Sequence, residues 1–406
     1  MNDTRLRILM LIPHLGVGGA QGAFLRLARY LATRAQVTVA VMQGDVSKAA
    51  DFPVFRLDER GGSKVRRWWG MFRRLRSLKR QHDVTISFLS GMNLLNALAG
   101  QRVRTIISER GSKRHDIGMS KRQRLIWTRL LDPLTYWRAG HVVAASEGLA
   151  HEIVTANPWA AAKVTSIEGV VEAAALVDAG DLPVEPEIEE MVEFDTIVTF
   201  GRLHIQKGYE FLLQTFACVL DSRPKARLLL IGDGDEQERL RDVATELGLR
   251  VGTNASEADV IFTGVKSDPV RYTRIGRVFA FPSLYEGLPN ALIEAIASGV
   301  PVLASDCPWG PRSILSGGIL GYDNELSLPT RLTHGTLMPL PVGLNSLTIW
   351  ADELEQALER SKSRVSKQDR LEAIERYDIG KTGPRWLQLV MEMSEPPKHS
   401  ERAPQP

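Results

Sequence analysis

The strongest constraint on the fold of this chain is a repeated alternation of short apolar runs with longer segments of helical spacing. Apolar runs such as those at residues 6–12 and 278–281 end in turns that contain glycine or proline, and segments with apolar residues every three or four positions follow them. This order is typical of β-α-β units and predicts parallel sheets covered by helices. Because 406 residues exceed what one hydrophobic core usually serves, we expect two doubly wound α/β domains facing a cleft.

The alternation is interrupted once, between residues 161 and 195, where the periodicity is lost and the sequence becomes acidic and contains proline. This change predicts a linker between the two domains. The end of the chain is polar and rich in proline, which favours disorder. The predicted segments are an N-terminal domain (1–170), an acidic linker (171–195), a C-terminal domain (196–380), a final helix (381–393) and a disordered tail (394–406).

The composition favours a folded protein of a reducing compartment. Apolar residues make up 44% of the chain and charged residues 24%, which is ordinary for a soluble globular protein. Cys218 and Cys307 are the only cysteines, too few for a disulfide framework. The apolar run near the start is shorter than a signal-peptide core or a membrane span, and no later run reaches spanning length. We therefore expect a cytoplasmic protein.

The stretch from Ser283 to Glu294 carries the clearest chemistry. It joins a predicted strand to a predicted helix, and Gly287 and Pro289 lie just before the first helical turn. The backbone N–H groups of such a turn have no partner within the helix, so they attract a phosphate. Glu286 and Glu294 border the same crevice at the carboxyl end of the strand. Taken singly, a helical Glu is more often solvated and Gly-x-Pro is more often a plain turn. Together they suit a nucleotide sugar, whose phosphates and hydroxyl groups need both kinds of partner.

A second turn of this kind follows the predicted strand at residues 196–200. Arg202 and Lys207 lie on either side of it. Arginine binds phosphate through paired planar hydrogen bonds and lysine acts as a point charge, so the two cations can neutralise a diphosphate. Taken alone, the turn is equally consistent with a basic surface patch. Its combination with Glu286 and Glu294 favours the diphosphate interpretation.

Two further turns give weaker signals. The glycine-rich turn after the first predicted strand fits the dinucleotide fingerprint poorly, because Gln21 stands where the third glycine belongs, and close packing of helix on strand explains it as well. Asp233 and Asp235 follow another predicted strand within an Asp-Gly pattern, which signals a turn, and no other cluster of ligands supports a metal. We expect neither a nicotinamide cofactor nor a metal ion.

The loop after the predicted strand at residues 105–108 is a candidate acceptor site. It ends at the same face of the predicted sheet as the glycine-rich turn. Its candidate residues are Glu109, Arg110 and His115, although any one of them, taken alone, is more often an ordinary surface residue.

The segment from Lys64 to Arg80 intersperses aromatic and aliphatic residues with basic ones. Trp68 and Trp69 are among its apolar residues, and it contains no acidic residue. A basic helix with aromatic residues on one side can lie in the interface of an anionic membrane, where each cation contributes about 1 kcal/mol. An ordinary amphipathic helix that covers a sheet explains the same pattern equally well. Nucleic-acid binding is disfavoured because no recognised module surrounds the segment.

The region around Glu286 strongly resembles the Glu-x7-Glu signature of the family-four retaining glycosyltransferases, and residues 201–208 resemble the Gly-Arg-Leu-x3-Lys-Gly motif that accompanies it. The resemblance covers nearly the whole chain and is strongest over residues 201–315. It implies a GT-B fold of two Rossmann-like domains, in which the second binds the nucleotide sugar, the first presents the acceptor, and the last helix, near Trp386, crosses back to the first. The signature positions are Glu286, Gly287, Glu294, Gly299, Pro301, Asp306, Gly310 and Pro311.

The resemblance also implies roles for individual residues. Arg202 and Lys207, with the backbone amides of residues 288–290, would stabilise the charge on the departing diphosphate. Glu286 would bind hydroxyl groups of the donor sugar, and Glu294 those of the ribose. The implied catalytic residues are therefore Arg202, Lys207 and Glu286, and the implied donor-binding residues are Gly19, Gly201, Gly264, Gly287, Leu288, Pro289, Asn290 and Glu294. Such enzymes retain the anomeric configuration and need no metal or other cofactor. Gln21 replaces the glutamate that is usual in the first turn of the family.

These features predict a retaining glycosyltransferase that moves a hexose or N-acetylhexosamine from a nucleoside-diphosphate sugar, with uridine as the expected base, to a glycan or lipid-linked acceptor. Residues 86–90, 108–110 and 306–311 look like those of family members that elongate bacterial cell-surface polysaccharides. Such a role suits the inner face of the cell membrane. Two alternatives remain: a nucleotide-sugar epimerase or hydrolase, which would convert the donor without an acceptor, and a non-catalytic, membrane-associated binding protein, which would show no turnover.

Overall fold

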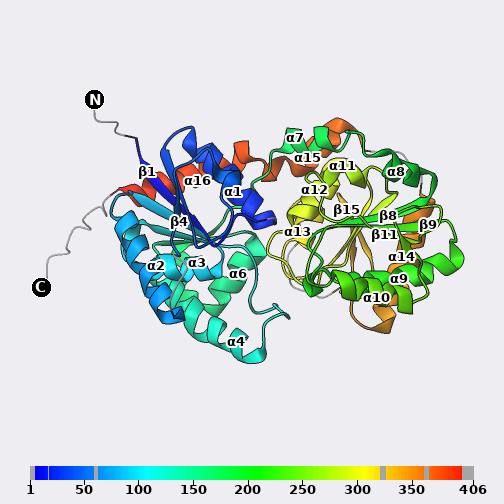
Figure 1. Ribbon diagram of the computed structural model, residues 1–406, viewed down its shortest axis with the longest axis horizontal. Helices are drawn as coiled ribbons and strands as arrows, with labels where there is room; N and C mark the ends of the chain where they lie inside the picture. Colours follow the sequence, from blue (N-terminus) through cyan, green and yellow to red (C-terminus); the bar gives the residue numbers. More distant parts are fainter. Residues whose placement is uncertain (1–4, 17, 59–62, 321–325, 361–364, 396–406) are drawn as a thin grey trace, which may run out of the picture. The chain divides into compact units, whose positions relative to one another are not determined.

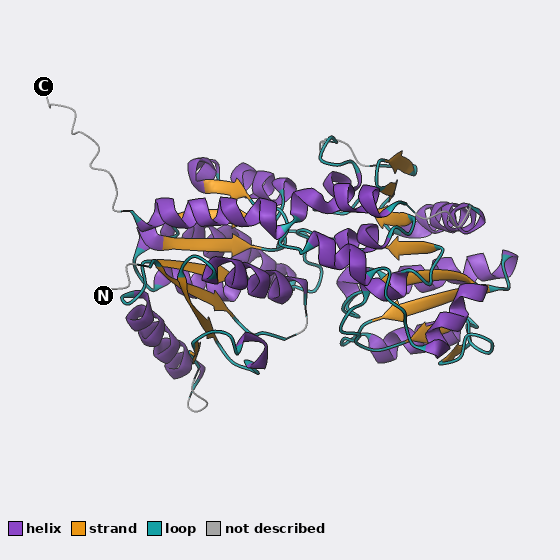
Figure 2. Ribbon diagram, turned by 90° about the horizontal axis from the view of Figure 1, so that it is seen from above, coloured by secondary structure: helices purple, strands orange, loops and turns teal. Residues whose placement is uncertain are grey.

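The structure is a computed structural model that describes residues 5–16, 18–58, 63–320, 326–360 and 365–395. The chain divides into two compact units (Figure 1). Each unit contains one sheet with helices packed against it (Figure 2). Unit 1 comprises Met1–Arg110, Lys121–Val170 and Ile379–Pro406, and unit 2 comprises Gly111–Ser120 and Val171–Asp378.

Unit 1 is built on a seven-stranded sheet with the order β3-β2-β1-β4-β5-β6-β7. Its strands are β1 (Arg7–Ile12), β2 (Gln36–Val41), β3 (Val54–Arg56), β4 (Val84–Phe88), β5 (Thr105–Glu109), β6 (His141–Ala144) and β7 (Val164–Ser166). Every neighbouring pair is parallel. The side chains of the central strands are buried along almost their whole length, as expected for a parallel sheet covered on both faces.

Helices cover both faces of this sheet. They are α1 (Gly19–Ala32), α2 (Lys64–Lys79), α3 (Ser90–Leu98), α4 (Lys121–Ile126), α5 (Asp132–Arg138), α6 (Glu147–Ala156) and α16 (Ile379–Ser394), with the short turns η1 (Ser47–Ala49), η2 (Arg102–Arg104), η3 (Trp127–Leu131) and η4 (Pro158–Lys163). Successive strand residues point to opposite faces. Accordingly, Ile8 and Met10 cluster with α1 and α16, whereas Leu9 and Leu11 cluster with α2 and α3.

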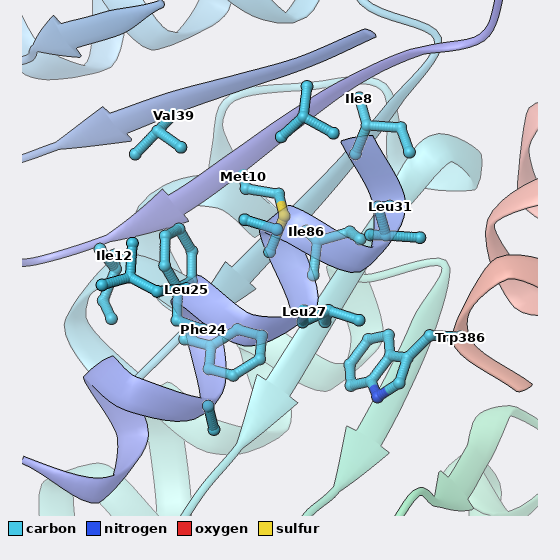
Figure 3. Close-up of a cluster of buried hydrophobic side chains, with 14 of the residues drawn as sticks. Ile8, Met10, Ile12, Phe24, Leu25, Leu27, Leu31, Val39, Ile86 and Trp386 are labelled. Carbon is cyan, nitrogen blue, oxygen red and sulfur yellow. The ribbon is translucent and has the colours of Figure 1, made fainter. Parts of the chain in front are cut away.

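The C-terminal helix α16 belongs to the core of unit 1. Trp386 is fully buried in the cluster that contains Ile8 and Met10 (Figure 3). Its ring stacks on Phe88 of β4, with 6.0 Å between the ring centroids. Residues 379–394 therefore complete the core of unit 1, although most of the chain between β7 and α16 forms unit 2.

Unit 2 contains an eight-stranded sheet with the order β10-β11-β9-β8-β12-β13-β15-β14. The strands are β8 (Asp195–Phe200), β9 (Ala226–Ile231), β10 (Val251–Gly252), β11 (Val260–Phe262), β12 (Val278–Phe281), β13 (Val302–Ser305), β14 (Thr330–Leu332) and β15 (Gly335–Met338). All neighbouring pairs are parallel except β14 and β15. After β8, the strands β9, β10 and β11 are added on one side of β8, and the strands from β12 onward are added on its other side.

The helices of unit 2 pack around this sheet. They are α7 (Ala173–Ala179), α8 (Pro186–Glu189), α9 (Tyr209–Ser222), α10 (Gln237–Glu246), α11 (Val270–Thr273), α12 (Asn290–Ser298), α13 (Pro311–Leu315), α14 (Gly343–Glu359) and α15 (Lys367–Ile374), with η5 (Glu190–Glu193), η6 (Ile205–Lys207) and η7 (Glu375–Tyr377). Phe216 of α9 and Trp350 of α14 are fully buried in one cluster with Leu228 and Leu230 of β9. This cluster is the main core of unit 2.

The segment predicted to be an acidic linker forms part of unit 2 and contains α7 and α8. Glu185 accepts hydrogen bonds from Lys266 Nζ at 3.0 Å and from Tyr272 Oη at 2.8 Å. A backbone hydrogen bond, together with those from Tyr272 and Lys266, lowers the pKa of Glu185 to about 2. Glu189 forms an ion pair with Arg274. Acidic residues of this segment therefore form ion pairs with basic residues of unit 2.

Several bounds differ from the predicted ones. The helix expected at residues 352–358 begins already at Gly343. The strand expected from residue 300 begins at Val302, after Pro301, which has no N–H to donate to a sheet. Residues 111–120, which we expected in the N-terminal domain, belong to unit 2. Residues 396–406 of the predicted tail lie outside the described residues. In the parts of the chain that the structure describes, no helix is both long and apolar enough to cross a membrane.

Candidate functional site

The two sequence motifs meet at the carboxyl ends of β8 and β12, which are neighbours in the sheet of unit 2. Residues 201–208 follow β8 and are called the β8 turn; residues 282–289 follow β12 and are called the β12 turn. The direction in which the chain adds strands reverses between β8 and β12. Open α/β sheets bind ligands outside the carboxyl ends of the strands at such a reversal.

The two turns are in direct contact. Gln206 donates from Nε2 to the carbonyl oxygen of Tyr285 at 2.7 Å, and its own carbonyl oxygen accepts from the Leu284 amide at 2.8 Å. Gly208 has a φ of +65°, and a Cβ there would collide with the carbonyl oxygen of Pro282. Glycine is required at this position by the left-handed backbone and by the close approach of the two turns.

Lys207 and Glu286 form the central ion pair of the site. Nζ of Lys207 lies 2.7 Å from Oε1 of Glu286, and the two side chains are only 15% and 9% exposed. The same Nζ lies 5.0 Å from the centre of the Phe281 ring. A charge-assisted hydrogen bond is stronger in such a buried setting than at the surface, because water competes less for the charges. The structure thus brings together two of the three residues predicted to be catalytic.

The backbone around Glu286 is fixed by the loop after β13. The Glu286 amide donates to the carbonyl oxygen of Pro308 at 2.5 Å, and the Trp309 amide donates to the carbonyl oxygen of Glu286 at 3.1 Å.

Burial raises the pKa of the Tyr209 phenol and of the Cys307 thiol, and the negative charge of Glu286 raises both further. Tyr209 and Cys307 therefore stay protonated at neutral pH.

Arg202 and three glycines border the same region. Arg202, the third residue predicted to be catalytic, is exposed in the β8 turn, so an anion can reach its side chain. The Gly232 amide donates to the carbonyl oxygen of Gly264 at 2.9 Å, and a Cβ on Gly232 would collide with the carbonyl oxygen of Gly201. Gly201 and Gly264, both predicted to bind the donor, therefore lie where the turns after β8, β9 and β11 converge.

The helix α12 begins at the end of the β12 turn. Pro289 is its N-cap residue and no side chain caps the helix, which leaves its first turn suited to an anion. Leu288 and Asn290 are buried, and Glu294 is half-buried one turn into the helix. Gly310, with a φ of +109°, approaches Pro289 so closely that a Cβ would lie 2.5 Å from the Cδ of the proline.

Residues 111–120 pack on the β12 turn. Gly111 forms an antiparallel bridge with Gly287, and Oη of Tyr285 donates to Oδ1 of Asp116 at 2.7 Å. Sequence reasoning missed Asp116, Tyr285 and Gln206. Tyr285 and Gln206 are adjacent in sequence to the motif residues Glu286 and Lys207, and this position could have identified them as site residues. Asp116 lies 169 residues from Tyr285, and no local pattern connects the two.

The three candidate acceptor residues lie in different surroundings. His115 is in unit 2, where its ring meets Trp309 edge-on with 5.9 Å between centroids. Glu109 is 2% exposed in unit 1 and accepts a hydrogen bond from Asn93 Nδ2 at 3.2 Å. Arg110, also in unit 1, is half-buried, and desolvation lowers its pKa to about 10. The structure therefore groups His115 with the residues around Glu286, whereas Glu109 is buried and Arg110 is half-buried in unit 1.

The other turns considered in the sequence, at Gly19–Gln21 and at Asp233, have structural roles within their own segments. Gly19 begins α1 in unit 1, and Gln21 of the same helix is buried. Oδ1 of Asp233 accepts from the Gly234 amide at 2.7 Å, so this carboxylate shapes its own turn. Among the described residues, no three His, Cys, Asp or Glu side chains are grouped so as to hold a metal ion. That the protein needs no metal or cofactor stays a prediction.

Two family models match this chain. The model described as Glycosyltransferase Family 4 matches residues 17–174, and the model described as Glycosyl transferases group 1 matches residues 195–331, which include both turns of the site. The chain belongs to glycosyltransferase family 4. The family predicted from the Glu-x7-Glu stretch is thereby confirmed.

The relatives of this chain are similar to it over part of their length. An uncharacterized glycosyltransferase of Methanocaldococcus jannaschii is 27% identical over 244 residues, which are 56% of this chain and 57% of that protein. The capsular polysaccharide biosynthesis glycosyltransferase CapM of Staphylococcus aureus is 26% identical over 194 residues, which are 46% of this chain and 49% of CapM. The chain thus spans about half the length of these relatives.

A solved structure confirms the fold. HepE of Anabaena, crystallised with UDP-glucose, superposes with a TM-score of 0.73 at 18% identity, covering 95% of this chain and 99% of that chain. At this identity the likeness concerns the fold alone. The predicted GT-B fold, with two parallel-sheet α/β domains, is confirmed.

Proposed function

We propose that this protein is a retaining glycosyltransferase that moves a hexose or N-acetylhexosamine from a UDP-linked donor to a glycan or lipid-linked acceptor in cell-surface polysaccharide synthesis. The observation that carries the proposal is the largely buried pair of Lys207 and Glu286 at the strand-order reversal of unit 2. The relatives support the chemistry, because CapM is named for capsular polysaccharide biosynthesis and HepE was crystallised with UDP-glucose.

In this proposal Lys207 and Arg202 neutralise the diphosphate as it leaves. Breaking the bond between sugar and phosphate transfers negative charge to the nucleotide, and cations already positioned near that charge lower the barrier. The ion pair with Glu286 holds the Lys207 ammonium in place at 2.7 Å. The N-terminus of α12 adds the partial positive charge of the helix dipole. The enzyme needs no metal ion in this scheme.

The two glutamates bind hydroxyl groups in this proposal. The hydrogen bond from Lys207 uses Oε1 of Glu286, so Oε2 is the oxygen assigned to a hydroxyl of the donor sugar. Glu294, one turn into α12, binds the ribose. Gly264 lies near the base, at the carboxyl end of β11. Sugar hydroxyls matched by carboxylates are a source of donor specificity, because a donor that lacks the hydroxyl leaves a buried carboxylate without its partner.

The first test is thermal stabilisation by a panel of nucleoside diphosphates and their sugars. A ligand at 100 times its Kd adds about 2.7 kcal/mol to the stability of the folded protein. UDP and at least one UDP-sugar are expected to raise the Tm of the wild type and of Lys225→Ala, which removes an exposed lysine outside the site. Lys207→Ala should lose most of that increase. No stabilisation by any nucleoside diphosphate would contradict the proposal.

Incubation with the donor alone separates the proposed function from its enzymatic alternative. A glycosyltransferase is expected to leave most of a UDP-sugar unconverted until an acceptor is supplied. A nucleotide-sugar epimerase or hydrolase would convert the donor under the same conditions. Chromatography of the nucleotide products distinguishes the two outcomes.

We also propose that α2 contacts an anionic membrane surface. One side of α2 packs on the sheet of unit 1 through Met71, Leu75 and Leu78. The exposed surface of α2 carries Trp68 (40%) and Trp69 (61%) next to arginines. Tryptophan rings and basic side chains on one side of a helix suit the interface between water and lipid. The protein is then peripheral on the cytoplasmic face of the membrane.

A further inference from the structure

The loop after β13 is closed at its two ends by an ion pair. Residues 306–312, called the β13 loop, run from the end of β13 into the first turn of α13. Nε of Arg312 donates to Oδ1 of Asp306 at 2.8 Å and Nη2 donates to Oδ2, so the guanidinium and the carboxylate are joined by two hydrogen bonds. The Arg312 and Asp306 side chains are only 11% and 8% exposed. Paired hydrogen bonds of this kind fix the orientation of both partners as well as their separation.

The middle of the β13 loop holds the backbone of Glu286. The carbonyl oxygen of Pro308 accepts from the Glu286 amide, and the Trp309 amide donates to the Glu286 carbonyl oxygen. The next residue, Gly310, packs against Pro289 at the end of the β12 turn. The β13 loop therefore holds the β12 turn at two points, and one of them is the residue assigned to the donor sugar.

The ion pair joins the end of a strand to a short helix. The Asp306 amide donates to the carbonyl oxygen of Met338 in β15 at 2.8 Å, so the start of the loop is anchored to the sheet. α13 has only five residues, Pro311–Leu315, and a helix of that length is marginal without tertiary partners. Arg312 ties this helix to the anchored end of the strand. The loop between the two side chains is thereby closed into a ring.

The pair also compensates a charge close to the site. Burial raises the pKa of the Cys307 thiol, and the negative charges of Glu286 and Asp306 raise it further, so both carboxylates lie near this thiol. The guanidinium of Arg312 neutralises Asp306. Without that guanidinium, Asp306 would repel Glu286 and compete with it for the ammonium group of Lys207.

We infer that Asp306 and Arg312 are positioning residues for Glu286. Their paired hydrogen bonds set the shape of the β13 loop, and the loop sets where the Glu286 carboxylate meets the donor sugar. The inference rests on the proposed function, in which Glu286 binds a hydroxyl group of that sugar. Lys207 and Arg202 belong to the β8 turn, so a loosened β13 loop should weaken binding of the sugar and leave the contacts with the diphosphate in place.

The first measurement is hydrogen exchange in the full-length protein without ligand, read by mass spectrometry. Asp306→Asn and Arg312→Lys each break the paired hydrogen bonds, and Arg312→Lys keeps the positive charge. In both variants the amides of Glu286 and Trp309 should exchange at least about tenfold faster, because a hydrogen bond to a charged group slows local opening by about that factor or more. The amides of the β8 turn should exchange as in the wild type.

A second ion pair of unit 2 provides the matched control. Arg250 donates to Asp259 from Nε at 3.0 Å and from Nη2 at 2.6 Å, and the Asp259 side chain is 4% exposed. These residues directly precede β10 and β11, so they lie at the opposite edge of the sheet from the donor site. Asp259→Asn should lower the Tm without changing the exchange of Glu286 and Trp309. This control separates positioning from a general loss of stability.

The second measurement compares UDP with the UDP-sugar that stabilises the wild type most in the thermal panel. In Asp306→Asn and Arg312→Lys, the Kd for UDP should stay close to the wild-type value. The Kd for the UDP-sugar should rise about tenfold, which is the effect of losing one hydrogen bond to a charged group. Asp259→Asn should bind both compounds like the wild type.

The outcomes separate the inference from the function on which it rests. Wild-type exchange of the Glu286 and Trp309 amides in both loop variants would overturn the inference. So would an affinity for the UDP-sugar that falls no more than the affinity for UDP. Should Asp306→Asn fail to fold, Arg312→Lys decides the matter, because it keeps the charge of the pair. If no nucleoside diphosphate stabilises the wild type, the proposed function fails, whereas hydrogen exchange still decides whether the pair positions Glu286.

Discussion

The ion pair of Lys207 and Glu286 gives the sharpest prediction, because its two members should affect stability alike and nucleotide binding differently. Lys207→Met and Glu286→Gln each remove one charge from a pair separated by 2.7 Å, with side chains 15% and 9% exposed. A hydrogen bond to a charged group contributes about 1.5 to 3 kcal/mol. In a domain of the size of unit 2, 1 kcal/mol shifts the Tm by about 2 to 4 °C. Each variant should therefore lower the Tm of unit 2 by about 3 to 12 °C.

Nucleotide binding should separate the two variants. Lys207→Met removes the cation that meets the diphosphate, so UDP should stabilise this variant far less than the wild type. Glu286→Gln keeps that cation and removes the carboxylate that competes with the diphosphate for it. UDP should therefore stabilise Glu286→Gln at least as much as the wild type. Sugar transfer should fall in both variants by about 10²- to 10³-fold, the usual cost of removing one interaction that stabilises a transition state.

The assay is a titration of UDP against Tm, followed by sugar transfer once an acceptor is found. Lys225→Met is the matched control, because it removes an exposed lysine of unit 2 by the same substitution. Equal stabilisation of Lys207→Met and Glu286→Gln by UDP would show that Lys207 does not bind the diphosphate. An unchanged Tm in both variants would show that the pair contributes little to folding.

Three further predictions concern the turn, the acidic segment and α2. Gly208→Ala should lower the free energy of unfolding in urea by more than about 2 kcal/mol, because a Cβ there collides with a carbonyl oxygen. The control Gly248→Ala, also at positive φ but with open space around it, should lower it by about 1 kcal/mol. Equal losses would count against the close packing of the two turns. The lowered pKa of Glu185, about 2 in the folded protein against 4.5 ordinarily, means that this group adds stability above pH 4.5 that is lost as the pH falls toward 2. Glu185→Gln should flatten the acid side of the stability profile, and an unchanged profile would contradict this. Trp68→Ala/Trp69→Ala should reduce sedimentation with anionic vesicles. Vesicle binding that changes neither with this substitution nor with salt would contradict the proposed contact of α2.

The parallel-sheet organisation was predictable from the sequence because its signals are local. An apolar run, a glycine or proline and a helical period identify each β-α unit, and parallel strands align their carboxyl ends at one edge of a sheet. This rule places Lys207 and Glu286 at the same edge of the sheet, whereas the strand order that makes β8 and β12 neighbours comes from the structure. Their hydrogen bond at 2.7 Å shows how closely the two turns approach.

The features that the sequence did not reveal depend on distant partners. The acidic composition of residues 171–195 indicated a linker, but Glu185 bonds to Lys266, which lies 81 residues further along the chain. The assignment of residues 111–120 to unit 2 rests on contacts such as that of Asp116 with Tyr285, which no local pattern encodes. Residues 121–138 have apolar side chains at the period of a helix that faces a core, so only the structure shows that Leu125, Leu130 and Trp137 are exposed.

A crystal structure of the protein with UDP-glucose would test the proposed donor site. We predict that the diphosphate binds between the β8 turn and the N-terminus of α12, with Lys207 Nζ and the Arg202 guanidinium within hydrogen-bonding distance of its oxygens and Glu286 against the sugar. A diphosphate bound elsewhere in the molecule, with Lys207 still paired to Glu286 and the two turns unoccupied, would contradict it.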